Sequence, residues 1–288
     1  MRGVPIIVGY ALRECVRRRV FLVVLVLTVG FLALYALGAN EAFQVVEAEG
    51  TVSPEDPFTV DDRELAGATM FGLSMFGTLF LGAVLAAFLT LGTVRGDAER
   101  GLLQPLVVRP IGRTALLGGR FLAAASVCAV YVALIYAAAL LITWQIGDWT
   151  PDRIVTPAVQ LAAATAVIAA LSLLGSVFLS ATANGIAVFM LFGAGLVSGL
   201  LGQIGEALNS EKLMNVSEAA SWALPFEALY QDGLNGITAE ASGLTGFALT
   251  LGPFGGAQAA GSLLWPWTIA YIALAGAAAA LAFARKDL

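Results

Sequence analysis

Long uninterrupted runs of apolar residues alternate along the chain with short polar segments, and this pattern determines the expected fold. Five long stretches, 20–40, 68–94, 121–147, 154–205 and 241–284, contain no Asp, Glu, Lys or Arg. A helix rises about 1.5 Å per residue and needs roughly 20 apolar residues to cross a bilayer. The runs are continuously apolar rather than alternating, so they predict membrane-spanning helices and not the strands of a barrel.

The runs predict an all-α polytopic membrane protein with six transmembrane helices. The stretch 154–205 is too long for one crossing, because a single helix of that length would extend about 78 Å. Asn184-Gly185 is typical of a turn, so we expect the break within 180–185. The stretch 241–262 is rich in glycine and predicts a re-entrant or surface segment rather than a seventh span. The expected spans are 20–38, 68–94, 121–146, 154–179, 186–203 and 263–283.

The distribution of Lys and Arg predicts which side of the membrane each segment faces. With six spans, 12 of the 15 basic residues fall on the side that holds both termini, so this side is expected to be cytoplasmic. Residues 95–120 then form a cytoplasmic loop, and 206–262 form an outer segment. Residues 1–19 are basic and amphipathic, which predicts an interfacial helix. A topogenic charge cluster and a cleaved signal are the alternatives for 1–19.

Charged residues make up only 12% of the chain and histidine is absent, which excludes several kinds of chemistry. Without His, the usual metal ligand and general base are missing. A phosphate-binding loop requires Gly-Lys followed by Ser or Thr, but Lys212 follows Glu211 and Lys286 follows Arg285. The predicted spans also lack the charged residues that ion-coupled carriers keep at membrane depth. We therefore predict no catalytic, metal-binding or cofactor-binding residue in this chain.

The 95–120 segment combines charged residues with apolar ones such as Leu102 and Leu106. These leucines lie outside the predicted spans but are too apolar for a loop surrounded by water. They therefore favour docking of the segment into a groove of a partner protein. Pro105 would begin or split such a docking helix, because it breaks an interior hydrogen bond. The alternative is that the segment lies on lipid headgroups.

This segment resembles the loop after the second span of ABC-2 type transporter permeases. Their pattern runs Glu-x-x-x-Gly-Thr-Leu-x-x-Leu-Leu-x-x-Pro-(Ile/Val)-Ser-Arg, followed by apolar residues and Gly-Lys. Here Arg109-Pro110-Ile111-Gly112-Arg113 matches its end, with Gly112 in place of serine, and Gly119-Arg120 stands for Gly-Lys. The chain is similar in outline to the two-component bacterial and archaeal permeases, including the one that serves nitrous oxide reductase maturation.

The resemblance implies a transmembrane domain like that of type V exporters, without enzymatic activity of its own. It implies two copies of a cytoplasmic ATPase subunit, which would hold ATP and Mg²⁺, and a second permease copy as partners. Nucleic acid is not an expected partner. The residues implied to contact the ATPase subunit are Asp97, Glu99, Arg100, Gly101, Leu102, Leu106, Arg109, Pro110 and Arg113.

Gly195 and Gly199 form a small-x-x-x-small pattern that allows two helices to approach closely. The pattern predicts either a contact between the two permeases of a homodimer or ordinary packing within one chain. Two other functions remain open at this stage: a carrier or channel that works alone, and a membrane scaffold without transport.

Overall fold

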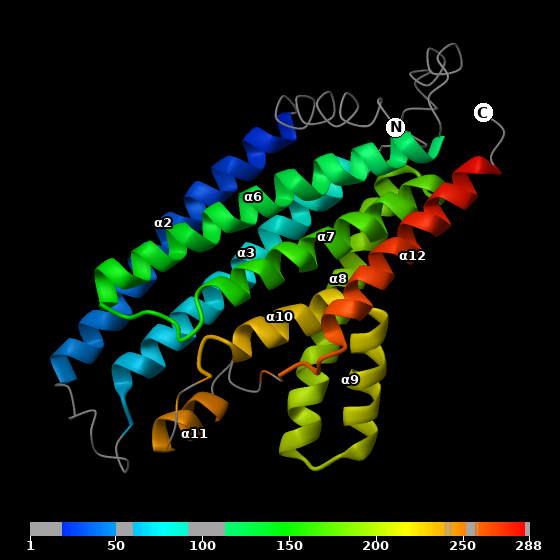
Figure 1. The fold of residues 1–288 in the computed structure, drawn as a ribbon. Helices are drawn as coiled ribbons and strands as arrows, with labels where there is room; N and C mark the ends of the chain where they lie inside the picture. Colours follow the sequence, from blue (N-terminus) through cyan, green and yellow to red (C-terminus); the bar gives the residue numbers. More distant parts are fainter. Residues whose placement is uncertain are drawn as a thin grey trace.

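The computed structural model describes residues 19–49, 60–91, 113–239, 241, 243–251, 257 and 259–285. These residues form helices and their connections, with no strand among them. Six of the helices are long and apolar enough to cross a membrane, which confirms the predicted all-α polytopic fold (Figure 1). They are α2 (Arg19–Glu49), α3 (Asp62–Thr90), α6 (Arg113–Gly147), α7 (Val155–Phe178), α8 (Ala181–Ala207) and α12 (Leu264–Ala284).

Four of these helices extend well beyond the predicted spans, and one of them is α8, which covers Ala181–Ala207 where 186–203 was expected. Helix α2 continues to Glu49 rather than ending at 38, α3 begins at Asp62 rather than 68, and α6 begins at Arg113 rather than 121. A charged residue ends an apolar run but does not end a helix, which continues where its backbone groups are satisfied. For α3, the Asp61 carboxylate accepts from the amides of Arg63 and Glu64, at 3.0 and 3.1 Å, as an N-cap. Part of the predicted 95–120 loop, from Arg113 onward, is therefore helical.

The expected turn at Asn184-Gly185 is wrong. The chain reverses just before it, with Leu179 in an extended conformation between α7 and α8, and Asn184 lies in the first turns of α8. Asn184 is buried, and its Nδ2 donates to the carbonyl of Ser172 in α7 at 2.8 Å. This bond across the hairpin gives the side-chain N–H a partner in α7, so the asparagine stays within a helix instead of forming a turn.

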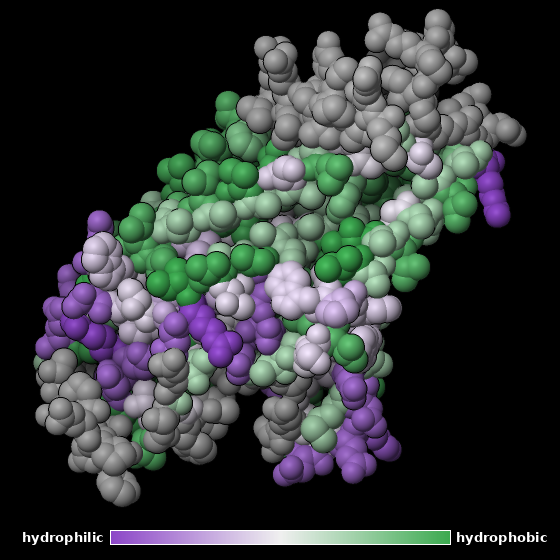
Figure 2. All heavy atoms as spheres, viewed as in Figure 1, coloured by the Kyte–Doolittle hydropathy of each residue, from purple (hydrophilic) through white to green (hydrophobic). Residues whose placement is uncertain are grey.

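Between α8 and α12 lie three shorter helices: α9 (Glu211–Ala223), α10 (Pro225–Asn235) and α11 (Gly243–Leu251). Asn209, with φ of 49°, reverses the chain between α8 and α9. Helix α11 has nine residues and extends about 14 Å, too short to cross a bilayer. Hydrophilic residues gather at the end of the molecule that carries these helices, whereas hydrophobic residues cover the flank of the long helices (Figure 2).

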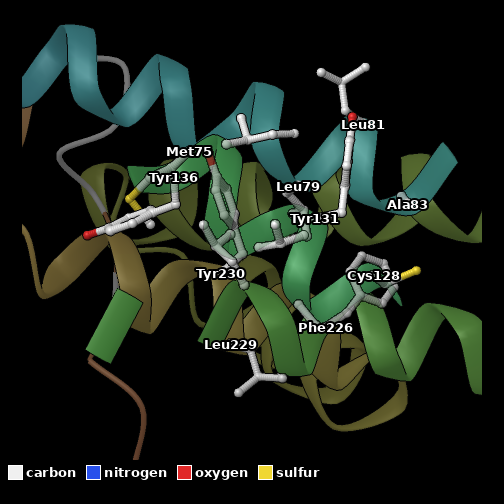
Figure 3. Close-up of a cluster of buried hydrophobic side chains, with 14 of the residues drawn as sticks. Met75, Leu79, Leu81, Ala83, Cys128, Tyr131, Tyr136, Phe226, Leu229 and Tyr230 are labelled. Atoms are coloured by element: carbon white, nitrogen blue, oxygen red, sulfur yellow. The ribbon is translucent and has the colours of Figure 1, made fainter. Parts of the chain in front are cut away.

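Two of the spanning helices form the centre of the bundle. Among the 18 most apolar successive residues of each helix, 72% are buried in α3 and 61% in α7. The corresponding shares are 17% in α2 and 22% in α12. Side chains such as Leu22 and Leu34 of α2 are exposed, as expected for a surface that faces lipid. Figure 3 shows part of the core, where Met75 and Leu79 of α3 meet Tyr136 of α6 and residues of α10.

Helices α2 and α6 are joined by two hydroxyl pairs. The hydroxyls of Thr28 and Tyr131 are hydrogen-bonded, and those of Tyr35 and Thr143 lie 2.5 Å apart. Residue numbers rise together along both helices, so α2 and α6 run parallel. A parallel first and third crossing is what the alternating six-span topology requires.

Candidate functional site

The predicted ATPase contact lies almost entirely outside the described residues. Residues 92–112 are not described, and they contain Asp97, Glu99, Arg100, Gly101, Leu102, Leu106, Arg109 and Pro110. The remaining predicted contact, Arg113, is the first residue of α6. The structure describes the two helix ends that the 92–112 segment joins, the end of α3 and the beginning of α6. The contacts of these two ends determine which helices would move with the segment.

On the C-terminal side, the first turns of α6 are packed into the bundle. Leu117 is buried in a small cluster with Leu173 and Val177 of α7 and Phe283 of α12. Packed interiors are nearly incompressible, so such a cluster transmits displacement. Movement of the chain at Arg113 would therefore act on three spanning helices together.

On the N-terminal side, the last turn of α3 lies against the beginning of α8. A Cβ built on Gly185 would lie 3.3 Å from a methyl carbon of Leu91, the residue that ends α3. Thr90 is buried, and its hydroxyl donates to the carbonyl of Ala86 at 2.8 Å. Both helix ends that flank the 92–112 segment are thus held by neighbouring spans.

The flanks of the segment lie at one end of the bundle. In Figure 1 the end of α3, the beginning of α6 and the end of α12 lie together, at the end opposite the one that carries α9, α10 and α11. The buried cluster that contains both Leu117 and Phe283 agrees with this placement. The 92–112 segment and the 206–262 segment therefore attach to opposite ends of the helices.

At both glycines of the small-residue pattern, side chains of the same chain fill the space where a Cβ would lie. A Cβ on Gly195 would meet the ring of Phe226, and one on Gly199 would meet the side chains of Glu227 and Gln231. All three partners belong to α10. Packing within one chain therefore explains both glycines, and the dimer contact there stays a prediction.

This junction of α8 and α10 buries a carboxyl group that the sequence analysis did not single out. Glu227 is only 2% exposed, and its Oε1 accepts from Gln231 Nε2 at 2.8 Å. Burial raises the pKa of Glu227 to about 7, although the bond from Gln231 opposes this rise. In the sequence, Glu227 lies in a polar segment with several other acidic residues and is not distinguished from them. Its place beside Phe226 in an amphipathic helix was the one signal of burial.

An arrangement of six long apolar helices, with a polar segment joining the second to the third, defines the class as a multi-pass membrane protein. The particular family follows from a comparison with family models. The model described as ABC-2 family transporter protein matches residues 6–288. The chain therefore belongs to this family and is a membrane permease component of an ABC transporter. No curated protein matches the chain.

Proposed function

We propose that the chain is the permease subunit of an ABC-2 exporter, driven by ATP that a separate cytoplasmic subunit hydrolyses. The match to the family over residues 6–288 carries this proposal, because the family works with an ATPase partner. Two sequence features support it: the chain has no phosphate-binding loop, and its basic residues gather on the side of the 95–120 segment. Both termini and this segment then face the cytoplasm.

In this proposal the 95–120 segment receives the movement of the ATPase. Leu102 and Leu106 dock in a groove of the partner, while Glu99 and Arg109 determine the register by charge. The packing of Leu117 against α7 and α12 gives the movement a route into the spans. ATP and Mg²⁺ bind to the partner alone, and the permease moves as the partner closes.

The test is co-purification of the tagged permease from the membranes of its own host, with any retained ABC ATPase identified by mass spectrometry. We expect the wild type to retain the ATPase, and Arg109→Glu and Glu99→Lys each to reduce the retained fraction at least tenfold. The matched control is Arg153→Glu, which reverses a charge between α6 and α7, at the other end of the bundle. If the wild type retains no ATPase, or if Arg153→Glu is as damaging as Arg109→Glu, the proposal is wrong.

The assembly we propose holds two permease copies and two ATPase copies. The α2 and α8 surfaces expose many apolar side chains, which suits contact with lipid or with a second copy. Native mass spectrometry of the purified complex measures the subunit ratio directly. A complex with one permease per two ATPase subunits would contradict the homodimer.

The similarity to the permease for nitrous oxide reductase maturation leads to a narrower proposal, a role in metalloenzyme assembly. Deleting the gene should then lower the metal content of one secreted enzyme while its polypeptide level stays unchanged. Normal metal loading in the deletion strain would exclude this role but would leave the permease function untouched.

A further inference from the structure

A cavity of about 440 Å³ lies between α8, α9, α10 and α12. It is lined by residues from all four helices and by 259–263, which precede α12. Small-molecule sites usually have volumes of about 300–1,000 Å³, so a ligand of modest size fits. The cavity belongs to the end of the bundle that carries α9–α11, opposite the end of α3 and the beginning of α6 (Figure 1).

Three buried oxygen atoms around this cavity have no hydrogen-bond partner among the described residues. They are Glu227 Oε2, Gln231 Oε1 and Ser198 Oγ. Buried polar atoms almost always have a partner, and leaving one unpaired costs about 1–3 kcal/mol. A carboxylate and an amide carbonyl are acceptors only, so the missing partner must donate hydrogen bonds.

The charges around the cavity favour a cationic donor. Glu218 of α9 supplies a second carboxyl group, and none of the lining residues is a lysine or an arginine. No group of three or more His, Cys, Asp or Glu that could hold a metal is found in the described part of the chain. An organic cation donates N–H bonds to these oxygens and does not require the set of ligands that a metal ion needs.

The other walls are aromatic and apolar. Trp222 and Trp267 line the cavity with their ring centroids 5.7 Å apart, and Leu264 adds an aliphatic surface. The Trp267 Nε1 already donates to the carbonyl of Trp222 at 2.8 Å, so this indole offers its ring rather than its N–H. Indole faces attract ammonium groups and also contact alkyl chains.

We propose that this cavity is a binding site for a primary alkylammonium compound. The Glu227, Gln231 and Ser198 side chains, which line the cavity, would turn their unpaired oxygens toward the ammonium group. The alkyl chain would lie against Trp222 and Trp267. A primary ammonium has three N–H donors, so one such group can serve up to three acceptors. The site needs no ATPase subunit, so this inference goes beyond the function proposed above and stands or fails separately.

Gly199 is part of the same arrangement. A Cβ at this position would collide with the Glu227 carboxylate, and it would lie 2.6 Å from Gln231 Nε2. The glycine therefore allows the bonded pair of Glu227 and Gln231 to lie against α8 at the edge of the cavity. The small residue that suggested a dimer contact has a role in the geometry of this site.

The test is calorimetric titration of hexylammonium into the full-length permease, without ATPase, in nanodiscs of phosphatidylcholine at pH 8. We expect saturable binding that 1-hexanol does not reproduce, and at least tenfold weaker binding by Glu227→Gln. The control is Glu211→Gln, which removes the same charge from an exposed residue of α9 outside the cavity and should bind as the wild type does.

Several outcomes would overturn the proposal. Equal binding of hexanol, or of hexylammonium to Glu227→Gln, would mean that only the apolar surface or the lipid is bound. Saturation by Na⁺ with no binding of hexylammonium would assign the oxygens to an alkali cation. If Glu227→Gln does not fold, Ser198→Ala replaces it and should weaken binding about threefold. Unchanged binding by Ser198→Ala would then refute the site.

Discussion

Gly195 of α8 lies directly beneath the aromatic ring of Phe226 of α10. A Cβ added to Gly195 would come within 2.5 Å of the ring carbon Cζ, and Phe226 is only 1% exposed. The same ring stacks on Phe192, one turn earlier in α8, with centroids 5.9 Å apart. One ring inserted at a glycine thus holds the short helix α10 on the spanning bundle.

This contact predicts that Gly195→Ala destabilises the permease by about 1–3 kcal/mol, the usual cost of overpacking a filled site. The matched control is Gly193→Ala on the same helix, where an added Cβ meets nothing within 4 Å. That change should stay within about 0.5 kcal/mol of the wild type. Thermal unfolding in detergent compares the variants, and equal midpoints for the two alanines would contradict the packing described here.

The pair of hydroxyls on Tyr35 and Thr143 predicts a smaller effect. Tyr35→Phe removes the bond between α2 and α6, while Thr143 keeps its own bond to the carbonyl of Ala139 at 2.8 Å. Polar bonds between membrane helices contribute about 0.6 kcal/mol on average, so we expect a loss of that order. Ser126→Ala serves as the control, because the Ser126 hydroxyl donates to the carbonyl of Leu122 within its own helix. A loss for Ser126→Ala as large as that for Tyr35→Phe would argue against a special role for the pair.

Trp149, in the connection between α6 and α7, should be sensitive to replacement. Its Nε1 donates to Glu64 Oε2 at 2.6 Å, and its ring lies against Gly67, so it joins this connection to the beginning of α3. We expect Trp149→Phe to cost about 1–3 kcal/mol, because the carboxylate loses its donor. Trp144→Phe, at a residue that is 51% exposed, should cost little. Unfolding midpoints measured under one detergent condition decide between these expectations, and the reverse order would refute them.

The buried carboxyl of Glu227 predicts a stability that depends on pH. Its pKa of about 7 lies above the ordinary value of 4.5, so between these values the folded chain keeps a proton that the unfolded chain loses. Stability should therefore fall by about 3 kcal/mol as pH rises from about 4.5 to 7, in the absence of amine. Glu227→Gln lacks this titration and should gain stability over the wild type across that window.

Unfolding midpoints from pH 4 to pH 9, taken as the difference between wild type and Glu227→Gln, measure this effect. Glu211→Gln is the control, because it removes a carboxyl from an exposed residue. Its difference from the wild type should stay constant across the same range. A constant difference for Glu227→Gln as well would show that this carboxyl is not buried as described.

The membrane-spanning segments could be predicted from the sequence because the requirement for crossing a bilayer is local. About 20 successive apolar residues suffice, and each such run is visible without knowing its neighbours. The side of each segment is likewise a prediction from local counts of Lys and Arg. The likeness of the 95–120 segment to the ABC-2 loop rested on consecutive residues, and the family match over residues 6–288 agrees with it.

Helix ends and polar burial depend on residues that are distant in the chain, so only the tertiary structure decided them. Asn184 suggested a turn until its bond to Ser172 in α7 placed it inside α8. Gly199 suggested a dimer contact, whereas Glu227 and Gln231 of α10 occupy the space beside it. The sequence pattern suggests that Glu227 faces solvent, but the packing of α10 against α8 buries its carboxyl group. The sequence by itself determined the crossings and the family, because these depend on neighbours along the chain. Packing decided which polar atoms are left to bind a ligand, because that depends on neighbours in space.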